Sequence, residues 1–221
     1  PLNPVEMAML DKDSVIAVLE GDTEIASLFT SVFGDDAFVD VDAAYDNFGR
    51  AVAAYERSAE VTQFTSAFDE KFNDNREGQT MSVGEQLFRQ NCTTCHAMGR
   101  HGGGYPLFTN HKYVNAGVPE NFLISDPNDP SDNDLGLGPV VDDPAQNGKF
   151  KVPTLRNIEL TAPYSHNGYF ATLEEMVSFM NDNSGYTPEV SENLSTEVGN
   201  LGLTEEECAE IVSFLKTLTD K

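Results

Sequence analysis

Apolar residues recur at helical spacing along two stretches near the start of this chain. Residues 14–33 carry such a pattern, and its interruption near Gly21 predicts two short helices instead of one long helix. Residues 43–58 also place their apolar side chains along one stripe, which consists of Tyr45, Phe48, Val52 and Tyr55. A stripe of this kind predicts an amphipathic helix that buries one face.

Three later helix starts are marked by a Ser or Thr that is followed three residues on by Glu. In this capping box the two residues satisfy each other's backbone N–H groups. The pairs are Ser82 with Glu85, Thr172 with Glu175, and Thr204 with Glu207. They predict a short helix that runs directly into Cys92, a helix with the sequence LEEMVSFMN, and a final helix that ends near Leu218.

The other segments have the composition of loops. Residues 65–81 are polar and loop-like, and Gly, Pro, Asn and Asp dominate residues 98–151. A loop as long as the second one usually has a functional reason inside a compact domain, such as wrapping a ligand. Since no strand-rich region and no internal repeat stand out, the pattern predicts a mostly α protein with long irregular loops.

Residues 91–97 read NCTTCHA and contain the spacing Cys-x-x-Cys-His. Two thiols at this spacing can add across the two vinyl groups of a haem, and the histidine that follows is then held below the iron. A zinc site would need four ligands, and a thioredoxin-type pair would be expected near a βαβ pattern; the sequence offers neither. Cys92, Cys95 and His96 are therefore predicted to bind one covalent haem c.

The sixth ligand of the haem iron decides what such a site does. Histidine or methionine gives an electron carrier, with the higher potential for methionine, whereas an open position admits peroxide or oxygen. Spacing alone does not choose the ligand, because the methionines of residues 173–180 also fit the apolar face of a helix. The candidates are Met98, His101, His111, His166, Met176 and Met180.

The chain is strongly acidic, with 37 Asp and Glu against 13 Lys and Arg and a formal net charge of −24. Such a surface repels nucleic acid and anionic membranes and attracts basic protein partners, although solubility in a salty environment explains it equally well. No apolar run approaches the ~20 residues that a membrane span needs. The third cysteine, Cys208, falls on the apolar side of the last predicted helix, which favours a buried, inert thiol over a reactive one.

The segment GKFKVPTLRNIELTAPYSHNGYFATLEEMVSFM, residues 148–180, carries a family resemblance. It is similar to the C-terminal haem domain of the bacterial di-haem cytochrome c peroxidases and their methylamine-utilisation relatives. The similarity extends to NPVEM, AVAAYERS, PLFTNHKYVNAGVP and IVSFLKTLT elsewhere in the chain. It implies a mostly α, cytochrome c-like haem domain over residues 81–221, with residues 1–80 as a helical linker or extension that packs on it.

The resemblance also implies roles around the haem iron. Cys92 and Cys95 match the thioether cysteines, and His96 matches the proximal ligand. Met180 matches the distal ligand of the family's high-potential, electron-transfer haem, a position at which the methylamine-utilisation relatives have tyrosine. His166 matches a histidine close to this haem and is expected to support the haem rather than to bind the iron.

Two further implications concern charged groups near the haem. By resemblance Arg156 meets a haem propionate, which suits a bidentate pair of guanidinium and carboxylate; an arginine that braces a loop is the alternative. The family also places a calcium ion between its two haem domains. The backbone carbonyls at the positions of Thr161 and Pro163 would bind it, so calcium is a second expected cofactor.

The resemblance predicts an electron-transfer module of a peroxidase system. It would accept electrons from a small, basic donor cytochrome and pass them to a peroxidatic haem on a partner domain or chain. Family members have two haems, but this sequence has one Cys-x-x-Cys-His and no tryptophan, so the second haem domain is cleaved, separate or absent. The alternatives are a stand-alone haem peroxidase with an openable sixth site and a non-catalytic haem subunit of a larger assembly.

Whether the chain alone is an enzyme is therefore left open. Because haem c is attached on the exported side of the bacterial membrane in this family, a periplasmic or exported location is expected. The expected partners are the donor and the peroxidatic haem, without nucleic acid or a membrane span, and a homo-oligomer is compatible with the sequence.

Overall fold

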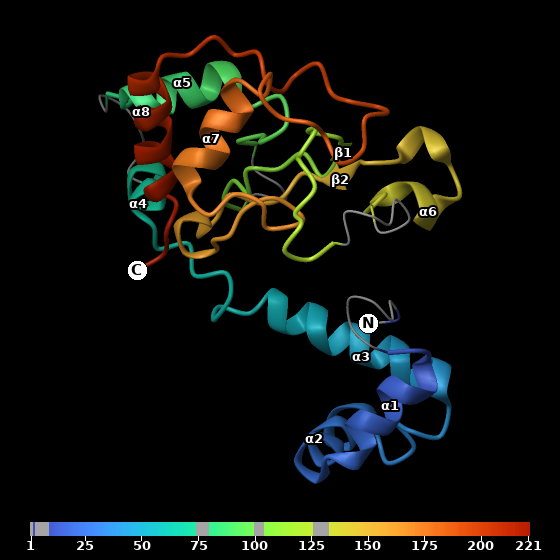
Figure 1. Ribbon diagram of the computed structural model, residues 1–221. Coiled ribbons are helices and arrows are strands. Elements are labelled where there is room, and N and C mark those ends of the chain that lie inside the picture. The colour runs from blue at the N-terminus through green and yellow to red at the C-terminus, as the bar shows by residue number, and fades with distance from the viewer. Residues whose placement is uncertain (1, 3–8, 74–79, 100–103, 126–132) are drawn as a thin grey trace. The chain divides into compact units, whose positions relative to one another are not determined.

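The structure is a computed structural model that describes residues 2, 9–73, 80–99, 104–125 and 133–221. It divides into two compact units, residues 1–63 and residues 64–221, which are described separately (Figure 1). Helices dominate the regular structure of both units, which confirms the prediction of a mostly α protein. The predicted boundary after residue 80, and the packing of the extension on the haem domain, stay predictions.

The described helices of the first unit are α1 (Lys12–Gly21), α2 (Thr23–Phe33) and α3 (Val41–Glu56). The predicted break near Gly21 is confirmed, and the residue that follows it causes the break. The Asp22 carboxylate accepts hydrogen bonds from two backbone N–H groups in the first turn of α2 and so begins a new helix. Asp11 and Asp40 cap α1 and α3 in the same way.

The apolar stripe predicted for residues 43–58 lies on α3, but it is buried only toward the start of the helix. Tyr45 and Phe48 are half-buried, whereas Val52 and Tyr55 are 41% and 57% exposed. Among the residues that the structure describes in this unit, the buried apolar ones are Val15, Ile16, Phe29, Ala37 and Ala44. The core of the first unit is therefore small.

The second unit contains five described α-helices and a two-stranded antiparallel sheet. The helices are α4 (Ala67–Asn73), α5 (Val83–Asn91), α6 (Leu137–Val141), α7 (Leu173–Asn181) and α8 (Glu205–Lys216). Strands β1 (Tyr113–Val114) and β2 (Phe150–Lys151) pair with Tyr113 opposite Lys151, and the 3-10 turns are η2 (Pro144–Gln146) and η3 (Ile158–Leu160). None of the described helices is long and apolar enough to cross a membrane.

Side-chain caps begin three of these helices, as the sequence predicts. Before α5, Ser82 Oγ accepts a hydrogen bond from the backbone N–H three residues on. Before α7 and α8 the reciprocal pairs are complete, Thr172 with Glu175 and Thr204 with Glu207. Each cap stabilises its helix by about 1 kcal/mol, so local sequence alone defines where these helices start.

The prediction of a loop over residues 65–81 is wrong where α4 lies. This helix is short and polar, so tertiary contacts stabilise it rather than propensity. The Asp69 N–H donates to Ser66 Oγ at 3.2 Å, and that hydroxyl donates to Asp69 Oδ2 at 2.6 Å. Phe68 is 3% exposed and stacks on Phe72. The Ser-x-x-Asp spacing and the two phenylalanines four residues apart were the available signals in the sequence.

The main core of the second unit lies against α5, α7 and α8, which lie side by side (Figure 1). A Cβ at Gly84 on α5 would lie 1.9 Å from the backbone carbonyl oxygen of Glu210 on α8. Only glycine therefore allows the two helices to approach this closely. The most deeply buried side chains here are Phe88, Phe108, Phe179 and Leu218. This packing fixes the position of α5, whose last turn leads into the Cys-x-x-Cys-His motif.

Candidate haem site

A cavity of about 440 Å³ lies in the second unit beside the end of α5. Its volume is in the range of about 300–1,000 Å³ that suits small-molecule and cofactor sites. The candidate residues that line it are Cys92, Cys95, His96, Thr161, Pro163, His166, Met176 and Met180. The fold thus brings most of the site residues expected from the sequence to one cavity.

One tight turn presents the two thiols and the imidazole. The N–H of Cys92 donates to the carbonyl of Phe88 and ends α5. The N–H groups of Cys95 and His96 then donate to the Cys92 carbonyl at 3.3 and 2.9 Å. Because this turn is closed on itself, the three side chains of the motif hold a fixed spacing at the cavity wall.

The His96 ring is oriented by a backbone carbonyl. Its Nδ1 lies 2.8 Å from the Phe108 oxygen, and a carbonyl only accepts, so Nδ1 carries the proton and Nε2 keeps a lone pair. Burial lowers the pKa of His96, while hydrogen bonding to the carbonyls of Phe108 and Pro153 acts in the opposite direction. A neutral imidazole with one nitrogen held by a carbonyl is the form that metal-ligating histidines adopt.

The two thiols of the motif are free in this structure. Burial raises the pKa of Cys92 to about 12, and burial together with Glu197 raises the pKa of Cys95. Two unpaired cysteines and a neutral histidine on the wall of one cavity are the groups that a covalent haem requires. The residues present therefore fit haem c.

The third cysteine, Cys208, is half-buried on α8. Burial and the neighbouring acids Glu207 and Glu205 raise the pKa of its thiol. A thiol with a raised pKa is a poor nucleophile, but Cys208 is less buried than the sequence predicts, and its inert role stays a prediction.

The cavity does not distinguish between the two methionines of α7 as the distal ligand of the iron. Met176 and Met180 both lie on α7, are both half-buried and both line it. Met98 packs against the core instead, and neither it nor His111 lines the cavity. His101 lies outside the described residues. Met180 as the axial ligand thus stays a prediction.

His166 reaches the cavity from the loop before α7. Its ring stacks on Phe150, with centroids 3.6 Å apart and planes 10° apart, and its Nε2 lies 3.1 Å from Glu189 Oε2. The Glu189 side chain is 6% exposed and also accepts hydrogen bonds from the Asp134 N–H and from Asn167. A ring nitrogen held by a carboxylate suits the supporting role expected of His166. Glu189 was missed in the sequence because no local motif surrounds it.

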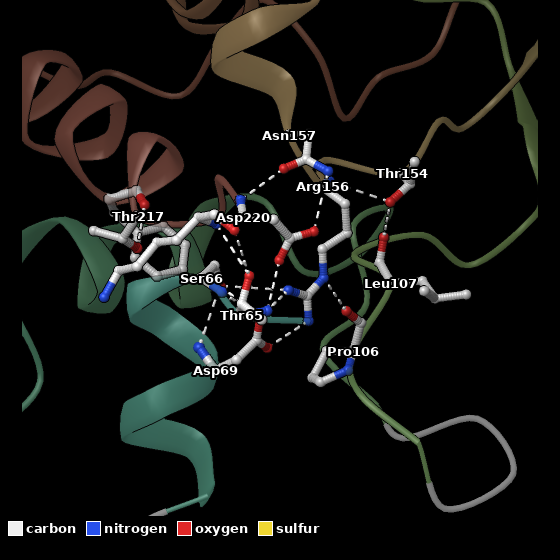
Figure 2. Close-up of polar contacts among 12 residues, drawn as sticks. Thr65, Ser66, Asp69, Pro106, Leu107, Thr154, Arg156, Asn157, Thr217 and Asp220 are labelled. Atoms are coloured by element: carbon white, nitrogen blue, oxygen red, sulfur yellow. Dashed lines mark hydrogen bonds and ion pairs between the residues drawn. The ribbon is translucent and has the colours of Figure 1, made fainter. Parts of the chain in front are cut away.

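Arg156 does not line the cavity. Figure 2 shows its guanidinium facing the Asp69 carboxylate and the Pro106 carbonyl. The two guanidinium nitrogens Nη1 and Nη2 donate to Asp69 at 2.6 and 2.7 Å, and Nε donates to Pro106 O at 2.9 Å. Arg156 is thus not among the residues that line the cavity, and its contacts with Asp69 and Pro106 brace a loop, while a contact with a haem propionate stays a prediction.

Thr161 and Pro163, whose backbone carbonyls are expected to bind calcium, line the cavity. Among the described residues, no group of three or more His, Cys, Asp or Glu could hold a metal ion. That finding does not bear on a site made of backbone carbonyls, so calcium at these two positions stays a prediction.

Two family models match this chain. The model of di-haem cytochrome c peroxidase matches residues 1–77, and the model of cytochrome c matches residues 81–219. The second match covers most of the unit that contains the cavity. Haem c is the cofactor of a cytochrome c domain, which agrees with the residues on the cavity wall.

Curated relatives point to the same proteins. Methylamine utilization protein MauG of Paracoccus denitrificans is 36% identical over 249 residues, which covers 100% of this chain and 63% of the relative. Cytochrome c peroxidase Ccp of Escherichia coli is 30% identical over 221 residues, which covers 99% of this chain and 41% of the relative. The chain thus spans about half the length of the curated relatives it matches.

A solved structure shares the fold. The diheme peroxidase BthA from Burkholderia thailandensis superposes with a TM-score of 0.77 over 99% of this chain and 61% of that protein, at 21% identity. At this identity the likeness concerns the fold alone. Together with the two family models, these relatives show that the chain belongs to the family of MauG and the di-haem cytochrome c peroxidases and contains a cytochrome c domain.

Proposed function

We propose that this chain binds one haem c and serves as the electron-transfer module of a di-haem peroxidase system. Cys92 and Cys95 form the thioethers, His96 is the proximal ligand and Met180 is the distal ligand. A haem c held in this way supplies a one-electron ferric/ferrous couple, and methionine ligation gives it a high potential. The protein accepts an electron from a small donor cytochrome and passes it to a peroxidatic haem on a partner domain or chain.

The observation that carries this proposal is the convergence of the motif and α7 on one cavity. The Cys-x-x-Cys-His turn and Met180 both contribute to its wall, with His96 neutral and oriented. The chain itself would bind the haem, exclude water with the apolar residues around it, and hold the Nδ1 proton of His96 on the Phe108 carbonyl. These are the tasks of an electron carrier, whose site need not open during turnover.

Absorption spectroscopy during a redox titration of the haem-loaded chain tests this function. We expect a low-spin ferric spectrum with the weak long-wavelength band of His/Met ligation, a high reduction potential, and a reduced form that hydrogen peroxide alone does not reoxidise quickly. A high-spin spectrum that changes at once on adding peroxide would instead make the chain a stand-alone peroxidase. A low-spin haem that no donor cytochrome reduces would make it a non-catalytic subunit.

The donor is proposed to be a small basic redox protein. The formal net charge of −24 creates a negative potential that steers cationic partners to the surface and speeds their encounter. We expect the second-order rate of reduction by a basic cytochrome to fall by about tenfold or more between low and physiological ionic strength. Stopped-flow measurements with a basic and an acidic cytochrome, the latter as control, check this. A rate that is indifferent to salt would leave the charge as a solubility feature.

The peroxidatic haem is proposed to belong to a partner domain or chain, because the family is di-haem and this chain spans about half of its curated relatives. The site of action is proposed to be the periplasm or another exported compartment, where haem c is attached in this family. Self-association into a homo-oligomer is compatible with this function.

A further inference from the structure

We propose that Arg156 and Thr154 are positioning residues for the proximal histidine. They hold the loop that presents the Phe108 carbonyl to His96 Nδ1. Asp69 fixes the orientation of Arg156 by accepting hydrogen bonds from both terminal nitrogens of its guanidinium. This inference rests on the proposed role of His96 as a haem ligand and extends it to side chains that touch neither the haem iron nor its ligand.

The Phe108 carbonyl points at His96 because Phe108 has an unusual backbone conformation. Its φ angle is +55°, in the left-handed region that residues other than glycine rarely adopt. Its side chain is completely buried, and its carbonyl oxygen lies 2.8 Å from His96 Nδ1. A residue stays in such a conformation only when its surroundings determine it, so the contacts on either side of Phe108 matter.

Two side chains bind the two carbonyls directly before Phe108. Arg156 Nε donates to the Pro106 oxygen at 2.9 Å, and Thr154 Oγ1 donates to the Leu107 oxygen at 2.7 Å (Figure 2). We call this pair of contacts the carbonyl clamp. On the far side of Phe108, Thr109 Oγ1 donates to the Val152 oxygen at 2.6 Å. The loop is thus tied on both sides to residues 152–156.

The donor direction of Arg156 is itself fixed. Asp69 accepts from both terminal guanidinium nitrogens at 2.6 and 2.7 Å, and the Arg156 and Asp69 side chains are 7% and 1% exposed. A planar guanidinium that is bound by a carboxylate in this bidentate way has one orientation, so its Nε–H can point only at Pro106. The Arg156 Cζ also lies 4.8 Å from the Phe64 ring centroid and 5.6 Å from that of Phe108. Lysine could replace the charge of Arg156 but not this geometry.

The strength of the hydrogen bond at Nδ1 controls the basicity of the imidazole. A carbonyl held close to Nδ1–H makes the ring a stronger donor through Nε2, which favours ferric iron. A loosened clamp lets the Phe108 carbonyl move away, weakens this hydrogen bond and favours ferrous iron. The clamp is therefore expected to lower the reduction potential relative to a chain without it.

Arg156→Lys tests the proposal in the haem-loaded chain. The equilibrium constant for reduction of the iron is expected to rise by about tenfold, since changes to groups that orient a metal ligand alter metal affinity or activity by about 10–100-fold. In the diamagnetic ferrous protein, the NMR signal of the His96 Nδ1 proton is expected to move upfield, as a weaker hydrogen bond requires. Arg89→Lys is the matched control, because Arg89 donates through Nε and Nη2 to Glu85 on the same helix and makes no contact with the clamp.

Thr154→Val keeps the proposal testable if Arg156→Lys does not fold. It removes the hydroxyl that binds the Leu107 carbonyl, leaves the buried ion pair in place, and is expected to shift both readouts in the same direction by a smaller amount. Folded variants with the potential and the Nδ1 proton shift of the unmodified chain would overturn the proposal. If the unmodified chain shows no histidine-ligated haem, the proposed function is wrong. That result differs from the one that overturns only the role of the clamp, in which the variants bind haem but show no change in potential or proton shift.

Discussion

Asp69→Asn is expected to lower the free energy of unfolding of residues 64–221 by about 3–5 kcal/mol, the cost of removing one partner from a buried ion pair. The substitution changes the shape of the side chain little but removes its charge, so it leaves the Arg156 guanidinium buried without a counter-charge. Both side chains are almost inaccessible to water, at 1% and 7% exposure, so solvent cannot replace the lost partner. Denaturant-induced unfolding of the haem-loaded chain measures the effect.

Glu174→Gln is the matched control for this prediction. Glu174 accepts from Lys216 at 3.0 Å, but the two side chains are 59% and 44% exposed, and surface pairs contribute about 0–1 kcal/mol. A double variant, Asp69→Leu with Arg156→Met, should be less unstable than Asp69→Asn, because it buries no unpaired charge. If Asp69→Asn costs no more than the surface control, the buried pair does not stabilise the fold in the way described.

Met180→Ala is expected to abolish the long-wavelength ferric band and to lower the reduction potential strongly. The thioether stabilises ferrous iron, and its loss leaves a water molecule or another weak ligand in its place. The shift should be a sizeable fraction of the about 0.8 V range over which axial ligands set haem potentials. Spectroscopy and potentiometry on the haem-loaded variant measure both changes.

Met176→Ala is the control, because Met176 lies on the same helix, is buried to a similar degree and lines the same cavity. Both substitutions lose a similar amount of packing, so a general loss of stability would affect them alike. The distal ligand assignment requires that Met176→Ala keep the band and the potential. If only Met176→Ala loses the band and lowers the potential, Met176 is the ligand. If neither variant changes the band or the potential, the distal ligand is another residue.

Local signals in the sequence were sufficient for most of the helices. The break near Gly21 and the caps at Ser82, Thr172 and Thr204 each depend on residues within one helical turn, so a single segment contains the whole signal. α4 was missed because its stability comes from contacts with distant residues, among them the Thr217 carbonyl, which accepts from the Phe68 N–H. Local pattern carries no information about such partners.

The same distinction applies to the site. The Cys-x-x-Cys-His motif is local, and its haem chemistry can be read from spacing. The ion pair of Arg156 joins residues 87 positions apart, and the hydrogen bond between His166 and Glu189 joins residues 23 positions apart. The propionate contact of Arg156 stays a prediction, and its partner Asp69 lies on α4, in a segment for which the sequence predicts a loop.

The close packing of α5 on α8 also bears on the order of events during synthesis. α5 begins at Val83 and α8 ends at Lys216, so the contact between them closes almost the entire second unit into a loop. The entropic cost of that closure is offset only once the last helix has been made. Before α8 has formed, the wall of the cavity that Cys92 and Cys95 line is incomplete. Their thiols then lack the burial that raises the pKa of Cys92 to about 12 in the complete fold. Covalent attachment of haem is therefore expected to be easiest before the chain has completed its fold.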